Sequence, residues 1–426
     1  MSVIGIDIGT TSVCGLKMDG AGMYGIRRRN HGFLDDVYSQ SPEEICSIVL
    51  EMADDLWDEQ VTDIAISSQM HGILLVNAAG RAISPFYTWK NPWGNAAFGD
   101  STIARYLTEQ TGRSVRSGYG LCTAFYLSRE GKLPADAAFL CNIGDYAAMR
   151  LSGRKEPVMN ITIAESIGGF DPATGDFDRG AAARLGLEPR LFPRVAAGNF
   201  VCGTYRNARV HGAFGDNQCS FLGSVGDYRR DVCINVGTGQ QISCFGEAYV
   251  PGGETEVRHF FDLGYLYVGV SQNGGKVYER LIRMIESLVF LYTGEKIDGY
   301  AKTQALWNDC LERHAFPEVV PALYGGVENQ PVGSVLLRGL KDGQDGLDLI
   351  TGYVAGMAEE LAGLYRRIPE SVRRNKTRFY ASGNGIVRNA LLWRLTEEKL
   401  NAKIERECRQ EAAAAGAALR ILMEET

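Results

Sequence analysis

Apolar and polar residues change their period several times along the chain, and each change predicts a strand or a helix. Residues 3–8 form an apolar run rich in Ile and Val, Gly-Thr-Thr follows at 9–11, and a strand-like segment covers 12–17, which together predict a β-hairpin. Residues 42–57 carry apolar side chains at helical spacing. The preceding Ser41-Pro42-Glu43-Glu44 supplies an N-cap, a proline in the first turn and a glutamate at the third position, so a helix is predicted there.

Strand and helix patterns continue to alternate along the rest of the chain. A strand pattern at 63–67 follows the first helix, and one at 232–236 opens the second half. Further strands are predicted at 258–272 and 376–382, and further helices at 354–367, 385–400 and 411–419. Such alternation is typical of α/β proteins.

The pattern of the first hairpin returns about half a chain later. Asp7-Ile8-Gly9-Thr10 is echoed by Asn235-Val236-Gly237-Thr238, again between two apolar strands. A repeat at this separation favours duplicated domains, although two unrelated glycine-containing hairpins are the alternative. A chain of 426 residues is long enough for two large domains, and we place them at 1–225 and 226–426.

Composition excludes several classes of protein. The net charge of −7 argues against a nucleic-acid partner, and the short basic run Arg27-Arg28-Arg29 is interpreted as a solvated strand end or turn. No apolar stretch approaches the roughly 18 residues that cross a bilayer, and Asp7 interrupts the first apolar run, so no membrane partner is expected. The ten cysteines form no CxxC pair, and the five histidines have no metal-ligand spacing. Reduced thiols and a cytoplasmic location are therefore expected.

Two glycine-threonine hairpins could hold a chain of phosphates, because small residues let phosphates approach backbone N–H groups. If a triphosphate is held there, Asp7 would hold a hydrated Mg²⁺ beside its phosphates, and the alternative is a side chain that merely stabilises a turn. Asp216, in Gly215-Asp216-Asn217-Gln218, stands at the start of a predicted helix. It is either an N-cap or a base that accepts a proton from a substrate hydroxyl.

Three further segments could contact ligands. Gln69-Met70-His71 follows a strand end, where the ligand loops of open α/β sheets gather. Trp89 suits the face of a polyol, and Ser382-Gly383-Asn384 could receive a nucleotide base against bare backbone. The alternatives are a structural histidine, a packing tryptophan and a plain strand-to-helix turn.

The order of these motifs resembles that of the FGGY carbohydrate kinases, members of the actin, Hsp70 and hexokinase ATPase superfamily. Asp-x-Gly-Thr-Thr, Gln-Met-His-Gly, Gly-Asp-Asn-Gln, Asn-x-Gly-Thr-Gly and Ser-Gly-Asn-Gly-x-x-x-Asn follow one another over almost the whole chain. The resemblance implies an α/β fold with two ribonuclease H-like domains that flank a deep cleft. It also implies transfer of a phosphoryl group from ATP to a sugar.

The resemblance assigns roles to matching positions. It implies that Asp216 is the base and that Asp7 organises Mg²⁺. The residues implied to bind ATP are Thr10, Thr11, Ser12, Gly237, Thr238, Gln240, Gly383, Asn384 and Asn389. The residues implied to bind the sugar are Gln69, Met70, His71, Trp89, Asp216 and Asn217.

Within the family, the segments at 88–89, 117–125 and 144–148 are most similar to sedoheptulokinases, with xylulokinases next. This implies phosphorylation of the terminal hydroxyl of sedoheptulose. Another ketose or polyol is the first alternative, and a degenerate protein that binds ATP and sugar without turnover is the second. Oligomeric state is not readable from the sequence, and a homodimer is one of the assemblies it allows.

The chain departs from the family pattern at three places. Cys14 stands where the family usually has Lys or Arg, and Lys17 projects from the opposite face of its strand, so one positive contact is missing. Ser382 replaces the first glycine of the adenosine segment. Lys90-Asn91 follows Trp89 where the family commonly has a polar residue and Asp, which puts the sugar in doubt more than the reaction.

Overall fold

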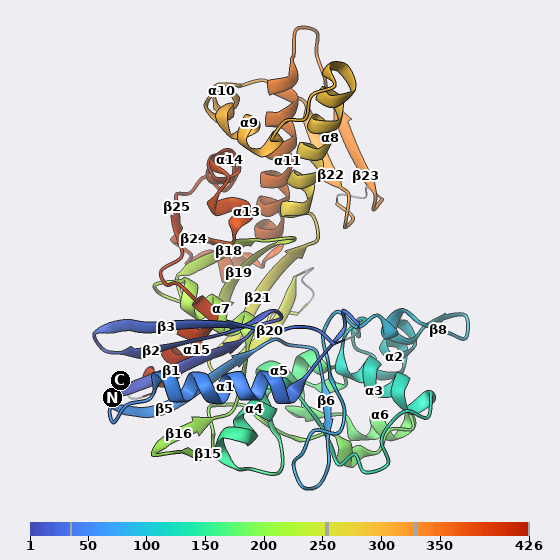
Figure 1. The fold of residues 1–426 in the computed structure, drawn as a ribbon. Coiled ribbons are helices and arrows are strands. Elements are labelled where there is room, and N and C mark those ends of the chain that lie inside the picture. The colour runs from blue at the N-terminus through green and yellow to red at the C-terminus, as the bar shows by residue number, and fades with distance from the viewer. Residues whose placement is uncertain (35, 252–254, 328–330, 425–426) are drawn as a thin grey trace. The chain divides into compact units, whose positions relative to one another are not determined.

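The structure, a computed structural model, describes residues 1–34, 36–251, 255–327 and 331–424 (Figure 1). The chain forms two compact units. The first contains Met1–Gly223, Arg258–Gly264 and the segment from Arg409 onward, and the second contains Ser224–Val257 and Tyr265–Cys408. This division differs from the expected 1–225 and 226–426, because the C-terminal segment belongs to the first unit.

A seven-stranded sheet forms the centre of the first unit, in the order β15-β16-β5-β1-β2-β3, with β17 also paired to β5. The strands are β1 (Ser2–Ile8), β2 (Ser12–Asp19), β3 (Gly22–Asn30), β5 (Val61–Ser68), β15 (Val201–Tyr205), β16 (Ala208–His211) and β17 (Phe214–Gly215). Strand β1 is antiparallel to β2 and parallel to β5. The predicted hairpin and the strand after the first helix are thus confirmed.

Two helices cover opposite faces of this sheet, α1 (Pro42–Leu56) and α15 (Ala412–Leu422). A Cβ on Gly15 would lie 2.4 Å from Met52 Sδ of α1, and a Cβ on Gly5 would lie 2.1 Å from the carbonyl oxygen of Ala414 in α15. Gly15 pairs with Ile6 on β1 and therefore faces the same side of the sheet as Ile6. Gly5 is the neighbour of Ile6 and faces the other side, so the two glycines leave room for helices on opposite faces. The Ala-rich composition of α15 permits this close docking.

The N-terminus of α1 is capped as its sequence predicts. Ser41 Oγ accepts a hydrogen bond from the backbone N–H of Glu44 over 3.2 Å, and Pro42 is the first helical residue. The other helices of this unit are α2 (Ile103–Thr111), α3 (Gly120–Arg129), α4 (Ile143–Ser152), α5 (Ile161–Ile167), α6 (Arg179–Arg184) and α7 (Asp216–Ser224). The helix predicted to begin at Asp216 is therefore confirmed.

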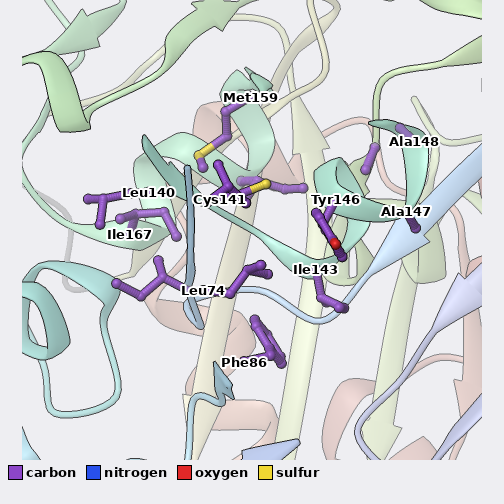
Figure 2. Packing of buried hydrophobic residues seen from close by; sticks show 14 of the residues in the cluster. Leu74, Phe86, Leu140, Cys141, Ile143, Tyr146, Ala147, Ala148, Met159 and Ile167 are labelled. Carbon is purple, nitrogen blue, oxygen red and sulfur yellow. The ribbon is translucent and has the colours of Figure 1, made fainter. Parts of the chain in front are cut away.

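The core of the first unit continues beneath α4, where Leu74, Phe86 and Leu140 pack with Tyr146 (Figure 2). The Tyr146 hydroxyl reaches out of this core and donates to Glu43 Oε1 over 2.6 Å. Short strands complete the unit: β4 (Ser39–Gln40), β6 (Leu74–Val76), β7 (Phe86–Tyr87), β8 (Ala97–Phe98), β9 (Ser101–Thr102), β10 (Phe139–Cys141), β11 (Val158–Asn160), β12 (Phe170–Asp171), β13 (Asp176–Phe177) and β14 (Arg194–Ala196).

The second unit repeats the strand order of the first. Its sheet runs β20-β21-β19-β18-β24-β25, in which β21, β19 and β18 are antiparallel neighbours and β24 is parallel to β18. In the first unit, β3, β2 and β1 are likewise antiparallel neighbours, and β5 is parallel to β1. The strands are β18 (Asp231–Val236), β19 (Gln240–Gly246), β20 (Glu256–Phe260), β21 (Gly264–Ser271), β24 (Arg378–Ser382) and β25 (Ile404–Arg406). The echoed hairpin is therefore part of a repeated topology.

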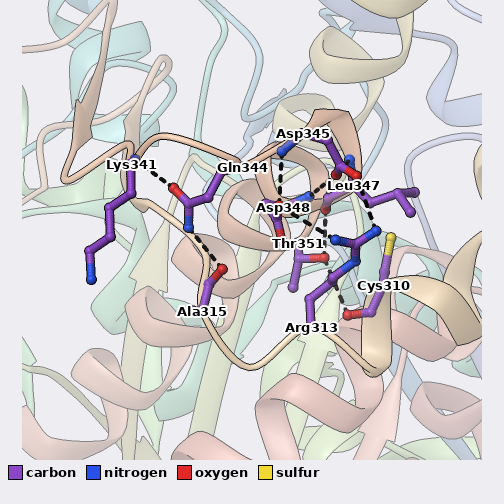
Figure 3. A network of polar contacts seen from close by, with 9 residues as sticks. All are labelled: Cys310, Arg313, Ala315, Lys341, Gln344, Asp345, Leu347, Asp348 and Thr351. Atoms are coloured by element: carbon purple, nitrogen blue, oxygen red, sulfur yellow. Dashed lines mark hydrogen bonds and ion pairs between the residues drawn. The ribbon is translucent and has the colours of Figure 1, made fainter.

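Helices of the second unit differ from the prediction at their ends. They are α8 (Gly275–Thr293), α9 (Gly299–Ala305), α10 (Trp307–Leu311), α11 (Gly346–Arg367), α12 (Glu370–Arg373), α13 (Asn384–Val387) and α14 (Ala390–Leu400), with a hairpin of β22 (Glu318–Ala322) and β23 (Ser334–Arg338). The helix predicted at 354–367 begins at Gly346, because Asp345 and Asp348 form a capping box that Arg313 also contacts (Figure 3). None of the helices in the described ranges has the length and apolarity that crossing a bilayer requires.

Two predicted elements are each divided. The strand predicted at 258–272 is wrong as a single strand, since the chain turns after β20 at Phe261, whose φ is 54°. The helix predicted at 385–400 is two helices, because Asn389 leaves the helix and its Oδ1 accepts from the N–H of Leu392 over 2.9 Å. All ten cysteines are free thiols, as expected.

Candidate functional site

Two aspartates lie at the carboxyl ends of strands in the first unit. Asp7 is the last residue but one of β1, and Asp216 begins α7 directly after β17. Both strands pair in parallel with β5, where Ser67 is opposite Asp7 and Ser68 is opposite Gly215. The Ser67 hydroxyl donates to Asp7 Oδ1 over 2.8 Å. The two carboxylates thus occupy the edge of the sheet at which open α/β proteins bind their ligands.

Both carboxylates titrate near neutral pH. Burial, and after it repulsion from Asp216, raises the pKa of Asp7 to about 7, although the Ser67 hydrogen bond acts in the opposite direction. Burial raises the pKa of Asp216 to about 6, against the field of Arg258. A carboxylate with a pKa in this range can both accept a proton from a hydroxyl and release it again.

Cys14 lies directly beside Asp7. The two residues pair across the β1–β2 hairpin, and the thiol is buried. Burial and the neighbouring Glu411 carboxylate raise the pKa of Cys14 to about 12, so the thiol is neutral at physiological pH. Position 14 therefore supplies no positive charge to the aspartate pair.

Side chains from other segments fix the turn between β1 and β2. His31 Nε2 donates to the carbonyl oxygen of Gly9 over 3.1 Å, which places the ring proton on Nε2. Gln40 Nε2 donates to the carbonyl oxygen of Thr10 over 2.6 Å, and Gln69 Nε2 bonds both Gly9 O and Gln40 Oε1. The turn is thus held from outside by residues that are distant in sequence.

The predicted phosphate residues Thr10, Thr11 and Ser12 occupy this turn. Trp89 Nε1 donates to Thr10 Oγ1 over 3.0 Å, so a predicted sugar residue contacts a predicted phosphate residue directly. Thr11 is exposed and Ser12 is half-buried. Trp89 keeps 45% of its surface exposed, and the ammonium of Lys90 lies over its ring at 5.6 Å.

Two of the predicted sugar residues support the site from within. Met70 is buried and packs beneath Gly215, where a Cβ would lie 2.9 Å from its sulfur atom. Gln69 is buried as well, and its side-chain amide is occupied by the β1–β2 turn. Its Oε1 has no hydrogen-bond partner among the residues that the structure describes. Met70 thus packs against the backbone next to Asp216, whereas Gln69 supports the β1–β2 turn.

His71 presents a ring and a strained backbone at the same loop. Its φ of 73° is rare for a residue other than glycine, and its ring stacks on Tyr119 with centroids 4.7 Å apart and planes at 6°. The ring Nδ1 donates to the carbonyl oxygen of Ser166 over 2.9 Å, and the backbone N–H donates to Ser166 Oγ. Asn217 follows Asp216 in α7, and its buried Oδ1 has no partner in the described part of the chain. Tyr119 and Ser166 were not predicted, because each is marked only by its contact with His71.

A cavity of about 650 Å³ in the second unit brings together residues from the other predicted motifs. Four of its lining residues were predicted to bind the nucleotide: Gly237, Thr238, Asn384 and Asn389. Sequence reasoning missed others, among them Lys276, Tyr300, Trp307 and Arg388. The run Gly274-Gly275-Lys276 between a strand and a helix was the available signal, since such runs favour phosphate binding.

The N-terminus of α8 is joined to the second hairpin. The N–H of Gly275 donates to the carbonyl oxygen of Gly237 over 2.8 Å, and that of Lys276 donates to Thr238 O over 3.2 Å. A Cβ on Gly274 would lie 2.1 Å from backbone atoms of Gly239, so only glycine fits this approach. The N-cap Gly274 has no side chain to cap the helix, which leaves a positive helix end beside the cavity.

Gln240 and Gly383 do not line the cavity. Gln240 is buried, and its side-chain Nε2 donates to Glu360 Oε2 over 3.0 Å. Gly383 has a φ of 82°, and a Cβ there would lie 2.5 Å from the carbonyl oxygen of Val236, so it lets β24 end close to β18. Neither residue is therefore among those that line the cavity.

These groups fit the cofactors that the sequence predicts. The buried Nδ2 of Asn389 has no partner among the described residues and belongs to a side chain that lines the cavity beside Lys276 and Arg388. Glycines, a helix N-terminus and two cations suit a nucleotide with its phosphates. Asp7 and Asp216 suit Mg²⁺, which commonly binds through one or two carboxylates while keeping water and phosphate ligands. The described residues contain no cluster of three or more His, Cys, Asp or Glu side chains that could hold a metal without such ligands.

Solved structures of sugar kinases share this fold. The xylulose kinase from Rhodospirillum rubrum superposes with a TM-score of 0.82 at 18% identity, covering 100% of this chain and 90% of that one. The Plasmodium falciparum glycerol kinase with ADP gives a TM-score of 0.79 at 15% identity, covering 99% and 90%. The expected α/β class with two domains is confirmed, and the fold defined here is that of the sugar kinases.

The family follows from sequence. The profile of the FGGY family of carbohydrate kinases, N-terminal domain, matches residues 2–230, more than half of the chain. The chain belongs to the FGGY family of carbohydrate kinases. Sedoheptulokinase from Mus musculus is 28% identical over 260 residues, 53% of this chain and 53% of that protein. Xylulose kinase from Streptomyces coelicolor is 24% identical over 174 residues, 38% and 36%. The chain spans about half the length, or less, of these two relatives.

Proposed function

We propose that the protein transfers the γ-phosphoryl group of ATP to a hydroxyl of a sugar or polyol. The observation that carries this proposal is the aspartate pair at the sheet edge, in which Asp216 has a pKa of about 6 beside Asp7. The glycine-lined cavity of the second unit supports it, because its lining suits a nucleotide. Family membership supports the same reaction class.

Asp216 acts as the base in this proposal. The acceptor hydroxyl gives its proton to Asp216 while its oxygen forms a bond to the γ-phosphorus, and the bond from that phosphorus to the bridging oxygen breaks to release ADP. A buried carboxylate suits this task, because desolvation raises its proton affinity. Asn217, the next residue in α7, has a buried amide oxygen with no partner in the described ranges and can accept from a substrate hydroxyl.

Asp7 would hold Mg²⁺ through water. The bound ion supplies positive charge to the phosphate oxygens. Ser67 orients the Asp7 carboxylate and stabilises its charged form. The Thr10–Ser12 turn, held by His31 and Gln40, would present backbone N–H groups and hydroxyls to the phosphates.

The sugar is most consistent with a ketose, and we propose sedoheptulose, giving sedoheptulose 7-phosphate. The support is the similarity to mouse sedoheptulokinase. An exposed Trp89 and the stacked His71–Tyr119 pair suit the face and hydroxyls of a sugar. Xylulose is the second candidate, favoured by the similarity to the Streptomyces xylulose kinase.

The test is ADP release with Mg-ATP and a panel of sedoheptulose, xylulose, ribulose and glycerol. We expect release that depends on sedoheptulose and is abolished by Asp216→Ala, while ATP binding measured by calorimetry stays within about twofold, because Asp216 lies outside the nucleotide cavity. Residual turnover in Asp216→Ala would remove the base role. ATP binding without release for any sugar would instead favour a degenerate kinase.

We also propose that the protein acts in the cytoplasm and that it forms a homodimer. Free thiols and a need for ATP suit the cytoplasm. A homodimer is proposed through the outer face of α8, where Leu288, Leu291 and Tyr292 are exposed. Light scattering of the wild type and of Leu291→Glu distinguishes a dimer from a monomer.

A further inference from the structure

Four side chains form a row across the sheet of the first unit. Ser67 pairs with Asp7, Asp7 pairs with Cys14, and Cys14 pairs with Arg28 on β3. Residues that are directly paired on neighbouring strands project from the same face of a sheet. Arg28 therefore projects from the face that carries Asp7, two strands or about 10 Å away at the backbone.

Glu411 holds the guanidinium of Arg28 on this face. Arg28 Nη2 lies 2.7 and 2.8 Å from the two carboxylate oxygens of Glu411, the residue that precedes α15. Glu411 has a φ of 49°, a backbone conformation that residues other than glycine adopt rarely. The Arg28 side chain is 57% exposed, so the ion pair is open to solvent and inexpensive to exchange.

The neighbouring cations have other partners. Lys17 is bonded to Asp58, away from this face. Arg420 is buried and bonded to Asp262. The charge of Arg258 lowers the pKa of Asp216, whereas the charge of Arg28 lowers the pKa of Asp7.

The geometry points to Arg28 as a ligand of the transferred phosphoryl group. The guanidinium rests on Glu411 in the structure and exchanges that carboxylate for phosphate oxygens when the nucleotide is bound. The inference rests on the proposed kinase activity. Arg28 makes and breaks no covalent bond; it neutralises charge on the equatorial phosphoryl oxygens while the new oxygen–phosphorus bond forms and the bond to the bridging oxygen breaks.

Arginine suits this exchange chemically. Its planar fork donates two N–H groups to a carboxylate or to a phosphate in the same way. The neutral Cys14 between Arg28 and Asp7 leaves the row without a competing cation. Glu411 would keep the guanidinium in place while no phosphate is present. Because the carboxylate competes with phosphate for Arg28 and also repels the phosphate, Glu411 would also weaken phosphate binding.

The test compares Arg28→Ala with a matched control, Arg29→Ala. Arg29 is the next residue of β3, projects from the opposite face and is bonded to Asp55. We expect Arg28→Ala to lower kcat by about 100-fold, within the range for removing one transition-state donor. Arg29→Ala should leave kcat unchanged. Cys14→Lys returns a cation to the same row of side chains. Added to Arg28→Ala, it should raise kcat at least tenfold above that of Arg28→Ala alone.

A second readout does not depend on turnover. A residue that contacts the transferred group should affect the affinity for ATP but not that for ADP. We expect Arg28→Ala to weaken ATP binding by about tenfold in calorimetry with ADP binding unchanged, and Glu411→Gln to strengthen ATP binding.

The outcomes separate the two proposals. If the wild type releases no ADP but Arg28→Ala still loses its preference for ATP, the kinase proposal fails and the role of Arg28 stands. If Arg28→Ala matches Arg29→Ala in both kcat and the ratio of ATP to ADP affinity, the inference is overturned. Circular dichroism of both variants shows whether a loss comes from unfolding, and rescue by Cys14→Lys shows that it comes from charge.

Discussion

Asp7 and Asp216 are the same kind of side chain with two different proposed tasks. Each is raised in pKa mainly by burial, but only Asp7 accepts a hydrogen bond from Ser67, and only Asp216 lies in the field of Arg258. The hydrogen bond from Ser67 favours the negatively charged form of Asp7, which can attract a cation. The buried environment of Asp216 leaves a carboxylate that can take up a proton during the proposed reaction.

The rate should fall as the pH is lowered through this pair. Asp216 must be unprotonated to act as a base, and its pKa of about 6 lies above the ordinary value of 3.8. Protonation therefore inactivates it at a higher pH than for an exposed aspartate, and kcat/KM should decline below pH 7 with an acid limb between about 6 and 7. A pH profile of kcat/KM measures this directly.

Ser67→Ala provides the control for that profile. The Ser67 hydroxyl lowers the pKa of Asp7, so its removal should raise that pKa and move the acid limb to higher pH by about 0.5–1 unit. An acid limb near pH 4 in the wild type would mean that neither aspartate is buried in the active state.

The sequence located these residues but not the direction of their side chains. Spacing predicted that Asp7, Asp216 and the two hairpins belong to ligand sites. Gln240 shows why spacing was insufficient, since its orientation depends on Glu360, which lies 120 residues away. Arg28 was interpreted as part of a solvated run, and only the register of three strands places it on the face of Asp7.

At the scale of elements, close backbone contact joins α7, the helix that begins at Asp216, to the C-terminal helix α15. A Cβ on Gly416 would lie 1.8 Å from the carbonyl oxygen of Cys219, and one on Gly223 would lie 1.9 Å from that of Ala412. Helices α15 and α7 therefore dock through glycine on both sides. Because Asp216 begins α7, the docking also positions the proposed base.

Gly416→Val should destabilise the first unit. The added side chain cannot fit without moving α15, and overpacking of this kind costs about 1–3 kcal/mol or more. The apparent unfolding temperature and kcat should both fall, as followed by circular dichroism and ADP release. Gly363→Ala in α11 is the matched control, because the nearest atoms to its Cβ lie 3.7 Å away and alanine favours helix. Equal losses in the two variants would contradict the docking argument.

Elements with local signals were predictable, and those set by distant contacts were less so. Helix α1 has its cap and its periodicity within 16 residues, and the β1–β2 hairpin has Gly-Thr-Thr at its turn. The division of 258–272 depends on a left-handed residue, Phe261, that carries no turn signal of its own. The early start of α11 was readable from Asp345 and Asp348, a capping pattern that the prediction did not use.

At the scale of the whole molecule, the two units repeat a strand order but differ in the candidate ligand groups that they carry. The first carries the carboxylates and the stacked His71–Tyr119 pair, and the second carries the glycine-lined cavity. Repetition was foreseeable from the echoed hairpins. The membership of the C-terminal segment in the first unit was not, because an Ala-rich helix gives no indication of which sheet it covers.

Hydrogen exchange should separate the two ligand sites. Mg-ATP alone should slow exchange at the N-terminus of α8 and in α13, which border the cavity. Sugar alone should slow exchange in residues 69–71 and at the start of α7. Protection of the α8 terminus by sugar alone would contradict this division of tasks, and Asp216→Ala should retain the Mg-ATP protection.

The docking of α15 onto β1 also has a consequence for synthesis on the ribosome. The strands of the first unit emerge early, yet the helix that covers one face of them begins at Ala412, after about 180 residues of the second unit. At a translation rate of 5–20 residues per second, that face of the sheet stays without its helix for on the order of 10–40 s. The half of the protein that is translated first is therefore the half that finishes folding last, and it is the half on which we expect chaperones to act.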